Sequence, residues 1–455
     1  MYIKHLAIEN LKSISKFEMD FPKPAGWHVI IGDNGAGKSS VAMGIALGLI
    51  GIEGESIFKI DWNTFVKNQQ KRFEIKFKIQ LNDFDFKALY EEEEIDGSYQ
   101  YHLFRERGED NYWRGSTRLL PHQIDWLKQI KDQSSTNSIK FNKLSENEKT
   151  LATMQIPNDN LNIGWFFAGF GPFRRFSGGE YDKKLEISNP RASAVISLFD
   201  EKYTLAEALV WLRELNYEGL EGNTKSKNTL KNLIDFLNKG GLLPFGTELT
   251  KVGSEGVFFK DGNGNEVEIN QLSDGFRSIL SLTFELIRLL IRFYDEEKVF
   301  KNFKSGDYTI DLSGVVIIDE IDAHLHPTWQ TRVGQWFTKY FPQLQFIVTT
   351  HSPLICRAAE NGSIWRLSAP GSEIPSGEIT GADKDRLIYG NILDAYSTDV
   401  FGENLERSEN GFEKLKRYSY LSQKAVYDPQ HLSKEDKEEL STLEKIFVTD
   451  ATFTL

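Results

Sequence analysis

The sequence is almost free of cysteine, since Cys356 is the only one in 455 residues. A single thiol excludes an internal disulfide and also a zinc site built from cysteines. Disulfides belong to oxidising compartments, so this composition fits a reducing one. We therefore expect a cytoplasmic protein that folds without covalent cross-links.

Long apolar runs and a positive net charge are also lacking. The longest apolar stretches, residues 41–52 and 279–290, are broken by glycines or charges, whereas a membrane span needs about 18 apolar residues in a row. The N-terminal residues alternate apolar and polar side chains, unlike a signal peptide. The formal net charge of -12 excludes a uniformly basic surface for nucleic acid but leaves room for a local basic patch. We expect no targeting segment and no membrane partner.

The N-terminal part contains the pattern strand, glycine-rich loop, helix. Residues 27–31 (WHVII) form a short apolar run of the kind buried in a sheet, and residues 39–49 have the pattern of a helix. Between them lies Gly32-x-x-x-x-Gly37-Lys38-Ser39, a phosphate-binding loop whose glycines let backbone N–H groups face a phosphate. Lys38 is predicted to reach the β- and γ-phosphates of ATP, and Ser39 to hold Mg²⁺. The predicted ATP-binding residues are Asn34, Gly35, Ala36, Gly37, Lys38, Ser39 and Ser40.

Two adjacent carboxylates end a second apolar run. Residues 315–318 (VVII) have the composition of a buried strand, and Asp319 and Glu320 follow directly. Asp319 is predicted to accept the water shell of Mg²⁺, and Glu320 to polarise the attacking water as a general base. Many strands end in an acid, so this pair gains its meaning from the phosphate-binding loop.

Two further motifs complete the set. Residues 271–278 (QLSDGFRS) open a helix predicted from about 274 to 294, which Ser273 or Asp274 can cap. The same groups, together with the Gly275 backbone, can bind the γ-phosphate of a nucleotide held by another subunit. Residues 347–353 (IVTTHSP) end a third apolar run in His351, which is predicted to sense or polarise the γ-phosphate.

The order of these motifs, with DEIDAHLHP at residues 319–327, resembles the ABC-type ATPase heads of the RecF, SMC and OLD group over residues 1–50 and 265–360. The resemblance implies an α/β fold, namely an ABC-type P-loop ATPase head with an inserted mixed α/β lobe and a helical C-terminal extension. We assign the head to residues 1–54 and 251–365, the lobe to residues 55–250 and the extension to residues 366–455.

The resemblance also implies a homodimer. Two heads would close around two ATP molecules, each held by the P-loop of one chain and by Ser273, Asp274 and Gly275 of the other. The catalytic residues would then be Lys38, Glu320 and His351. The resemblance further places a basic residue near the nucleotide and a loop across the dimer interface, and the matching residues here are Lys12 for the first and Asp322 and His324 for the second.

Residues 170–175 (FGPFRR) are similar to a loop in ATPases of Septu-type and retron-associated anti-phage systems, which act beside a nuclease or another effector. OLD proteins themselves carry a nuclease domain that needs a Glu and an Asp-x-Asp on strands. Here Asp383-Lys384-Asp385 has that spacing, but no apolar strand is predicted before it. We therefore predict an ATPase with no nuclease site of its own, which regulates a DNA-directed partner.

Other functions are also considered. A RecF-like DNA repair ATPase would bind DNA itself, through basic residues at 67–72 and through Arg174 and Arg175. A transporter subunit is disfavoured because LSDGF lies far before Asp319 and because the carboxylates continue as DEIDAHLHP. A metabolic kinase would lack the signature LSDGF at residues 272–276 and would also lack His351. His324 and His326 belong to the loop of the resemblance rather than to a metal site, and Gln69, Gln70 and Gln80 are equal candidates for a glutamine loop.

Overall fold

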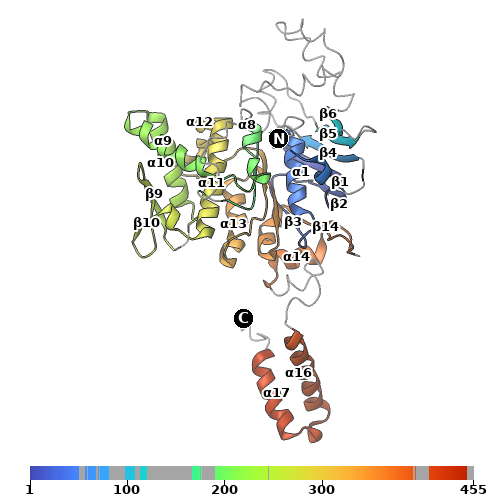
Figure 1. Cartoon of the computed structure of the whole chain (residues 1–455). Helices are drawn as coiled ribbons and strands as arrows, with labels where there is room; N and C mark the ends of the chain where they lie inside the picture. Colours follow the sequence, from blue (N-terminus) through green and yellow to red (C-terminus); the bar gives the residue numbers. More distant parts are fainter. Residues whose placement is uncertain are drawn as a thin grey trace. The chain divides into compact units, whose positions relative to one another are not determined.

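The computed structural model describes residues 1–50, 57–80 without 59, 68, 69 and 71, the strands at 98–107 and 113–119, residues 166–176 without 175, 190–392 without 244 and 373, residue 395, and 409–447. Packing divides the chain into two compact units, Met1–Tyr389 and Gly390–Leu455. Figure 1 draws their elements in sequence colours, and each unit is described by itself.

A mostly parallel sheet carries the motifs found in the sequence. Its strands lie in the spatial order β14 (Gly377–Ile379), β13 (Ser363–Arg366), β3 (Gly26–Ile31), β12 (Leu344–Thr350), β11 (Gly314–Ile318) and β7 (Phe167–Phe170). Neighbours from β13 to β7 are parallel, while β14 pairs antiparallel. Such strands are buried on both faces and read as continuous apolar runs, as predicted for β3 and β11. The parallel register brings the carboxyl ends of β3, β11 and β12 to one edge of the sheet.

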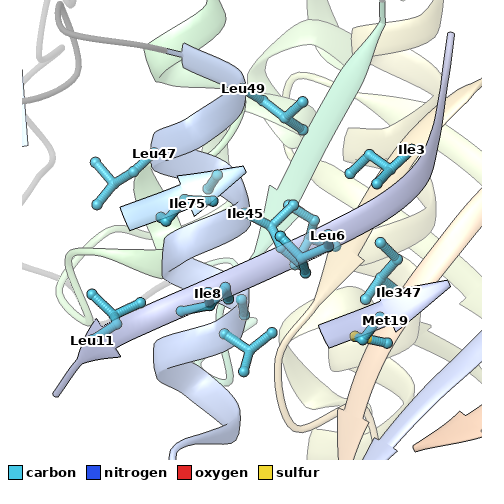
Figure 2. Packing of buried hydrophobic residues seen from close by; sticks show 14 of the residues in the cluster. Ile3, Leu6, Ile8, Leu11, Met19, Ile45, Leu47, Leu49, Ile75 and Ile347 are labelled. Carbon is cyan, nitrogen blue, oxygen red and sulfur yellow. The ribbon is translucent and has the colours of Figure 1, made fainter. Parts of the chain in front are cut away.

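An antiparallel sheet packs beside it, with the order β2 (Ile14–Asp20), β1 (Tyr2–Leu11), β4 (Arg72–Gln80), β5 (Ser98–Arg107) and β6 (Trp113–Leu119). In Figure 2, β1 crosses α1 (Lys38–Ile50), and Leu6 and Ile8 lie with Ile45 in one apolar cluster. The approach is close, because a Cβ on Gly48 of α1 would come within 2.0 Å of the Phe77 ring. The helix behind the P-loop is therefore held by both sheets.

A buried amide joins the two sheets. Gln345 of β12 is fully buried, and its side chain accepts from the Ile3 N–H at 2.7 Å and donates to the Ile3 carbonyl at 2.9 Å. The side chain thus satisfies one residue of β1 as a neighbouring strand would. Because unpaired backbone groups are costly in a core, this amide fixes where β1 meets the parallel sheet.

A segment of helices and short strands follows in the chain. It comprises α9 (Ala206–Leu220), α10 (Thr224–Lys239), β8 (Glu248–Gly253), β9 (Gly256–Lys260), β10 (Glu266–Glu268), the 3₁₀ turn η2 (Ile269–Gln271) and α11 (Asp274–Tyr294). The strands β9 and β10 pair antiparallel as a hairpin, and α11 has the predicted bounds. Arg288 of α11 pairs with Glu285 of the same helix and with Glu207 of α9, which ties the two helices together.

The remaining elements of this unit are short or connect strands: α3 (Trp62–Phe65), α8 (Pro190–Ser193), η1 (Ile196–Leu198), α12 (Glu296–Val299), η3 (Lys301–Ser305), α13 (Pro327–Tyr340), η4 (Pro353–Asn361) and α14 (Gly381–Tyr389). Within the segment 55–250, β4, β5 and β6 extend the antiparallel sheet, and β7 lies at an edge of the parallel sheet. The proposed domain boundaries stay a prediction.

The second unit contains α16 (Glu409–Tyr427), the turn η5 (Pro429–His431) and α17 (Lys434–Phe447). Arg417 of α16 pairs with Asp436 and Glu439 of α17, and Leu421 and Leu443 are buried. These pairs join a basic helix face to an acidic one. Among the helices that the structure describes in either unit, none has the length and apolar character needed to cross a bilayer.

Candidate functional site

The P-loop connects β3 to α1. Gly35 and Gly37 adopt left-handed backbone angles, with φ of 78° and 107°, which glycine reaches without steric cost. A Cβ on Gly37 would lie 2.5 Å from Ser13 Oγ, and that hydroxyl donates to the Ala36 carbonyl at 3.2 Å. The turn between β1 and β2 therefore supports the loop from beneath. Of the predicted ATP-binding residues, Asn34 and Gly35 are exposed, while Ala36, Lys38 and Ser40 are buried.

Lys38 directs its ammonium group into this loop. Its Nζ donates to the carbonyls of Gly32 at 2.7 Å and Asp33 at 3.0 Å, and lies 3.4 Å from Nδ1 of His351. Burial lowers the pKa of Lys38, and the charges of Glu320 and Asp319 oppose that shift. The structure thus brings Lys38 and His351 together, although they are far apart in the sequence.

The two carboxylates follow β11 and are held by β12. Thr349 of β12 donates its hydroxyl to Asp319 Oδ1 and accepts from the Glu320 N–H at 2.8 Å. Glu320 has a φ of 47°, a left-handed backbone angle that is uncommon for residues other than glycine. The backbone is therefore strained where the predicted general base sits, and the fold around it must maintain that conformation.

The next residues form a second clasp. Asp322 Oδ1 accepts from the Thr350 hydroxyl at 2.6 Å and from the His351 N–H at 3.4 Å. Thr350 Oγ1 also accepts from the Ser352 N–H at 2.9 Å, and the Ser352 hydroxyl donates to Gln330 at 2.6 Å. Both threonines of the TTHSP motif therefore position carboxylates of the DEIDAHLHP motif, a role that the sequence analysis missed.

The signature residues begin α11. Ser273 is the N-cap residue by its backbone angles, but among the described residues its side chain makes no capping hydrogen bond and lies exposed. Asp274 is exposed and pairs with Arg277. A Cβ on Gly275 would come within 2.8 Å of the His324 carbonyl, so the signature packs closely against the loop after the two carboxylates.

Arg174 lies beneath that loop. The sequence analysis offered it as a surface contact for DNA, and this was wrong, because the side chain is buried and donates to the carbonyls of Gly171, Asp319 and Glu320 at 2.7–2.9 Å. Burial lowers its pKa to about 10, and the charge of Asp319 opposes the shift. Its neighbour Arg175 lies outside the described residues.

Other predicted residues fall near the site or away from it. Lys12 has a φ of 49°, and its Nζ lies 3.6 Å from Met43 Sδ of α1 and 4.6 Å from the centre of the Phe65 ring. Burial lowers the pKa of Lys12, and the charge of Asp319 opposes that shift, so the two are in electrostatic reach. His326 caps α13, since its Nδ1 accepts from the Thr328 N–H.

Asp383 and Asp385 lie within α14. The short strand β14 precedes them, but its residues (GEI) are not an apolar run, so it does not contradict the prediction that no apolar strand lies before this pair. Asp383 pairs with Arg386 at 3.3 Å, and Lys384 donates to the Gly362 carbonyl at 2.9 Å. Of the candidate glutamines, Gln80 ends β4, Gln70 follows α3, and Gln69 lies outside the described part of the chain.

Comparison with protein families gives a match over most of the chain. Residues 28–357 match the model described as "AAA domain, putative AbiEii toxin, Type IV TA system". The Septu protein PtuA of Bacillus mycoides (strain KBAB4) is 25% identical over 80% of this chain and 40% of its own length. The "Retron Ec83 probable ATPase" of Escherichia coli is 25% identical over 88% of this chain and 80% of its own length. This chain thus spans less than half of the first relative.

Two solved structures that match this chain have lower sequence identity to it than these two relatives have. An SMC head bound to the C-winged helix domain of ScpA covers 83% of this chain and 98% of its own, with 17% identity and a TM-score of 0.43. The recombination mediator RecF covers 83% and 98%, with 12% identity and a TM-score of 0.40. The predicted kinship with Septu-type and retron-associated ATPases is confirmed by the family match and the curated relatives, and so is the predicted α/β P-loop fold.

Proposed function

This chain belongs to the AAA-domain family whose model covers residues 28–357 and is a P-loop ATPase, and from that premise we propose that it is an ATP-driven dimeric switch acting on a DNA-directed partner. Two chains would close around ATP, and hydrolysis would let them part. The open or closed state would govern a partner nuclease in anti-phage defence.

The observation that carries the proposal is the convergence of three strand ends. Lys38 follows β3, Asp319 and Glu320 follow β11, and His351 follows β12, with Lys38 Nζ 3.4 Å from His351. A cation, two carboxylates and an imidazole therefore surround the mouth of a glycine-rich loop at the carboxyl edge of a parallel sheet. Ligands of open α/β sheets bind at such edges, and the family match supports ATP as the ligand.

The donor set fits Mg²⁺ as the cofactor. Ser39 offers a hydroxyl and Asp319 a carboxylate, and Mg²⁺ prefers such oxygen ligands. The Thr349 hydroxyl already orients the carboxylate of Asp319. Metal ligands are usually held in this way by a hydrogen bond from a neighbouring group. When bound, Mg²⁺ would neutralise charge on the phosphates of the substrate.

The chain's own residues divide the chemistry. Lys38 would counter the charge of the β- and γ-phosphates with its buried ammonium group, and His351 would contact the γ-phosphate. Glu320 would accept the proton of the attacking water. Its N–H is fixed by Thr349 and its carbonyl by Arg174, so its backbone is held from both sides.

The exposed signature supports a site completed by a second chain. Ser273 and Asp274 are exposed where α11 begins, and a helix N-terminus attracts anions. A nucleotide on another head would supply that anion. Asp322 and His324, on the loop that packs against Gly275, would then lie at the interface between the heads.

A partner acting on DNA is favoured over direct DNA repair. Arg174 is buried, and Arg72 pairs with Glu74, so two of the basic residues offered as DNA contacts are engaged within the fold. The relatives named for Septu and retron systems support a role in anti-phage defence. We propose that the effector, rather than this chain, contacts the nucleic acid.

The native mass of the Glu320→Gln variant with ATP and Mg²⁺ tests the switch. Loss of the general base should slow hydrolysis by roughly 10²–10⁴-fold, so the variant should trap ATP and double its mass in light scattering. The control is Glu360→Gln, at an exposed carboxylate in η4, which should behave as wild type. The Ser273→Arg variant should bind ATP but stay monomeric.

A Glu320→Gln protein that holds ATP and remains a monomer at all concentrations would refute the head dimer. The effector is tested separately, by producing the chain with the products of neighbouring genes and challenging the cells with phage. Protection that needs both the ATPase and a nuclease supports the defence role. A salt-sensitive, ATP-dependent gel shift with the purified chain alone would instead favour the DNA repair function.

A further inference from the structure

Arg174 makes five hydrogen bonds beside the site, and only the one to the Glu320 carbonyl has been used so far. It follows β7, in the loop at residues 171–174, and only 4% of its surface is exposed. A buried guanidinium is costly unless its N–H groups are hydrogen bonded.

Among the described residues, the guanidinium meets an acceptor for each of its N–H groups. Nη1 donates to the carbonyls of Gly171 at 2.8 Å and Asp319 at 2.7 Å. Nη2 donates to the carbonyls of Glu320 at 2.9 Å and Ile321 at 3.4 Å. Because arginine presents five donors in a rigid plane, one side chain can hold three consecutive carbonyls of a turn.

The fifth contact leads to a different element. Nε donates at 3.2 Å to the hydroxyl of Ser278, which is buried in the second turn of α11. Ser278 lies just after the signature residues that begin this helix. The same guanidinium therefore touches the turn that carries the general base and the helix that carries the signature.

The turn needs such support. Glu320 has a left-handed φ of 47°, a conformation that is sparsely populated for residues other than glycine and persists only where neighbours impose it. The Thr349 hydroxyl accepts from the N–H of Glu320. Arg174 donates to the carbonyls of Asp319, Glu320 and Ile321. The close approach of Gly275 to the His324 carbonyl gives a second point where this loop meets α11.

We propose that Arg174 is a positioning residue for ATP hydrolysis, which holds the turn at Asp319, Glu320 and Ile321 in register with α11 so that the Glu320 carboxylate and the signature move as one body. The inference rests on the proposed roles of Glu320 and Ser273. It assigns to the arginine of the FGPFRR loop a coupling function between the base of one ATP site and the signature that completes the other. Arg174 itself contacts backbone carbonyls and the Ser278 hydroxyl, and we assign it no contact with the substrate.

The test compares Arg174→Lys with Arg288→Lys. Lysine keeps the charge but cannot reproduce the planar fork. Arg288 is a matched control because it is also largely buried and lies on α11, but its partners are Glu285 and Glu207, away from the turn. For Arg174→Lys we expect kcat to fall about 100-fold, the cost of a misplaced catalytic group. We expect little change in KM, because the hydrogen bonds of Arg174 among the described residues go to Gly171, the turn after β11 and Ser278, and none goes to the P-loop.

Ser278→Ala isolates the link to α11, since it leaves the four carbonyl contacts of Arg174 in place. It should lower kcat less than Arg174→Lys does, and it should weaken the ATP-dependent dimer of the Glu320→Gln variant. This variant also keeps the inference testable if Arg174→Lys fails to fold. Wild-type kcat in folded Arg174→Lys, or equal losses in Arg174→Lys and Arg288→Lys, would overturn the assignment.

The outcome is separable from that of the proposed function. Hydrolysis rates measured over a range of protein concentrations show the effect of Arg174 on the catalytic turn whether or not heads associate. A Glu320→Gln protein that never dimerises removes the coupling to a second site but not the positioning role. A large loss of kcat with an unchanged dimer would place the effect of Arg174 in the turn alone, and would overturn the coupling.

Discussion

Thr349 offers a sharp test of how the turn at Asp319 and Glu320 is held, because its hydroxyl is used twice. It donates to Asp319 Oδ1 and accepts from the Glu320 N–H at 2.8 Å, and the side chain is almost fully buried. Thr349→Val replaces the hydroxyl by a methyl group of similar size. The backbone pairing of β12 is unchanged, so the substitution removes the two hydrogen bonds and little else.

The expected size of the effect follows from the two partners. A hydrogen bond to a charged acceptor contributes about 1.5–3 kcal/mol and a neutral one about 0.5–1.5 kcal/mol. Loss of both should lower the free energy of unfolding by about 2–4 kcal/mol. Because the groups that orient a metal ligand typically matter by about 10–100-fold, kcat for ATP hydrolysis should fall by a similar factor.

The matched control is Thr283→Val in α11. Thr283 is fully buried, and among the described residues its hydroxyl has no hydrogen-bond partner. Removing an unsatisfied polar group from a core is neutral or stabilising. Urea unfolding followed by circular dichroism should therefore show Thr349→Val destabilised and Thr283→Val as stable as wild type or more so, with normal hydrolysis. Equal losses of stability in the two variants would refute the hydrogen-bond reasoning.

Three further outcomes are expected. Gln345→Leu should lower the free energy of unfolding by about 2–4 kcal/mol, because the substitution leaves a backbone N–H and a carbonyl of β1 unpaired. The control Gln343→Leu, at an exposed position nearby, should change the free energy of unfolding little in the same urea titration. Burial lowers the pKa of His28 from 6.5 to about 4, so the folded state binds fewer protons than the unfolded state between these pH values. The free energy of unfolding should therefore be highest above pH 6.5 and should fall by about 3 kcal/mol as the pH drops to 4. His28→Gln should remove this loss in unfolding curves recorded across that range. Gly37→Ala should abolish ATP binding measured by calorimetry, since its Cβ would collide with Ser13 Oγ at a positive φ. The control Gly371→Ala, also at a positive φ but with open space around its Cβ, should bind ATP normally.

Much of the fold was predictable because the signals are local. The run at residues 27–31, the glycine loop and the helix after it are contiguous, and they form β3, the P-loop and α1 as expected. The alternation of Phe73, Ile75, Phe77 and Ile79 is typical of a strand with one buried face, and these side chains are the buried ones of β4. Period and turn chemistry suffice for such elements.

The interpretation of Arg174 failed for a physical reason. Two adjacent arginines in a polar loop usually lie in solvent, since burying a guanidinium is costly. Here the carbonyls of a strained turn repay that cost, and those carbonyls come from residues about 145 positions away in the chain. The FGPFRR wording was the available signal, and it gave no indication of which backbone the arginine would meet.

The sequence by itself determined the chemistry of this protein: a phosphate-binding loop, two carboxylates after a buried run, a signature before a helix and a histidine after a strand. Each of these is a short segment whose residue types already imply its interaction. The tertiary structure alone decided how they are held, through Thr349 and Thr350 on the carboxylates, Arg174 on the turn, and Gln345 between the sheets. Such contacts depend on the parallel register of β3, β12 and β11, which places the ends of distant strands side by side. No local pattern encodes that register, because it is set by the packing of the whole sheet.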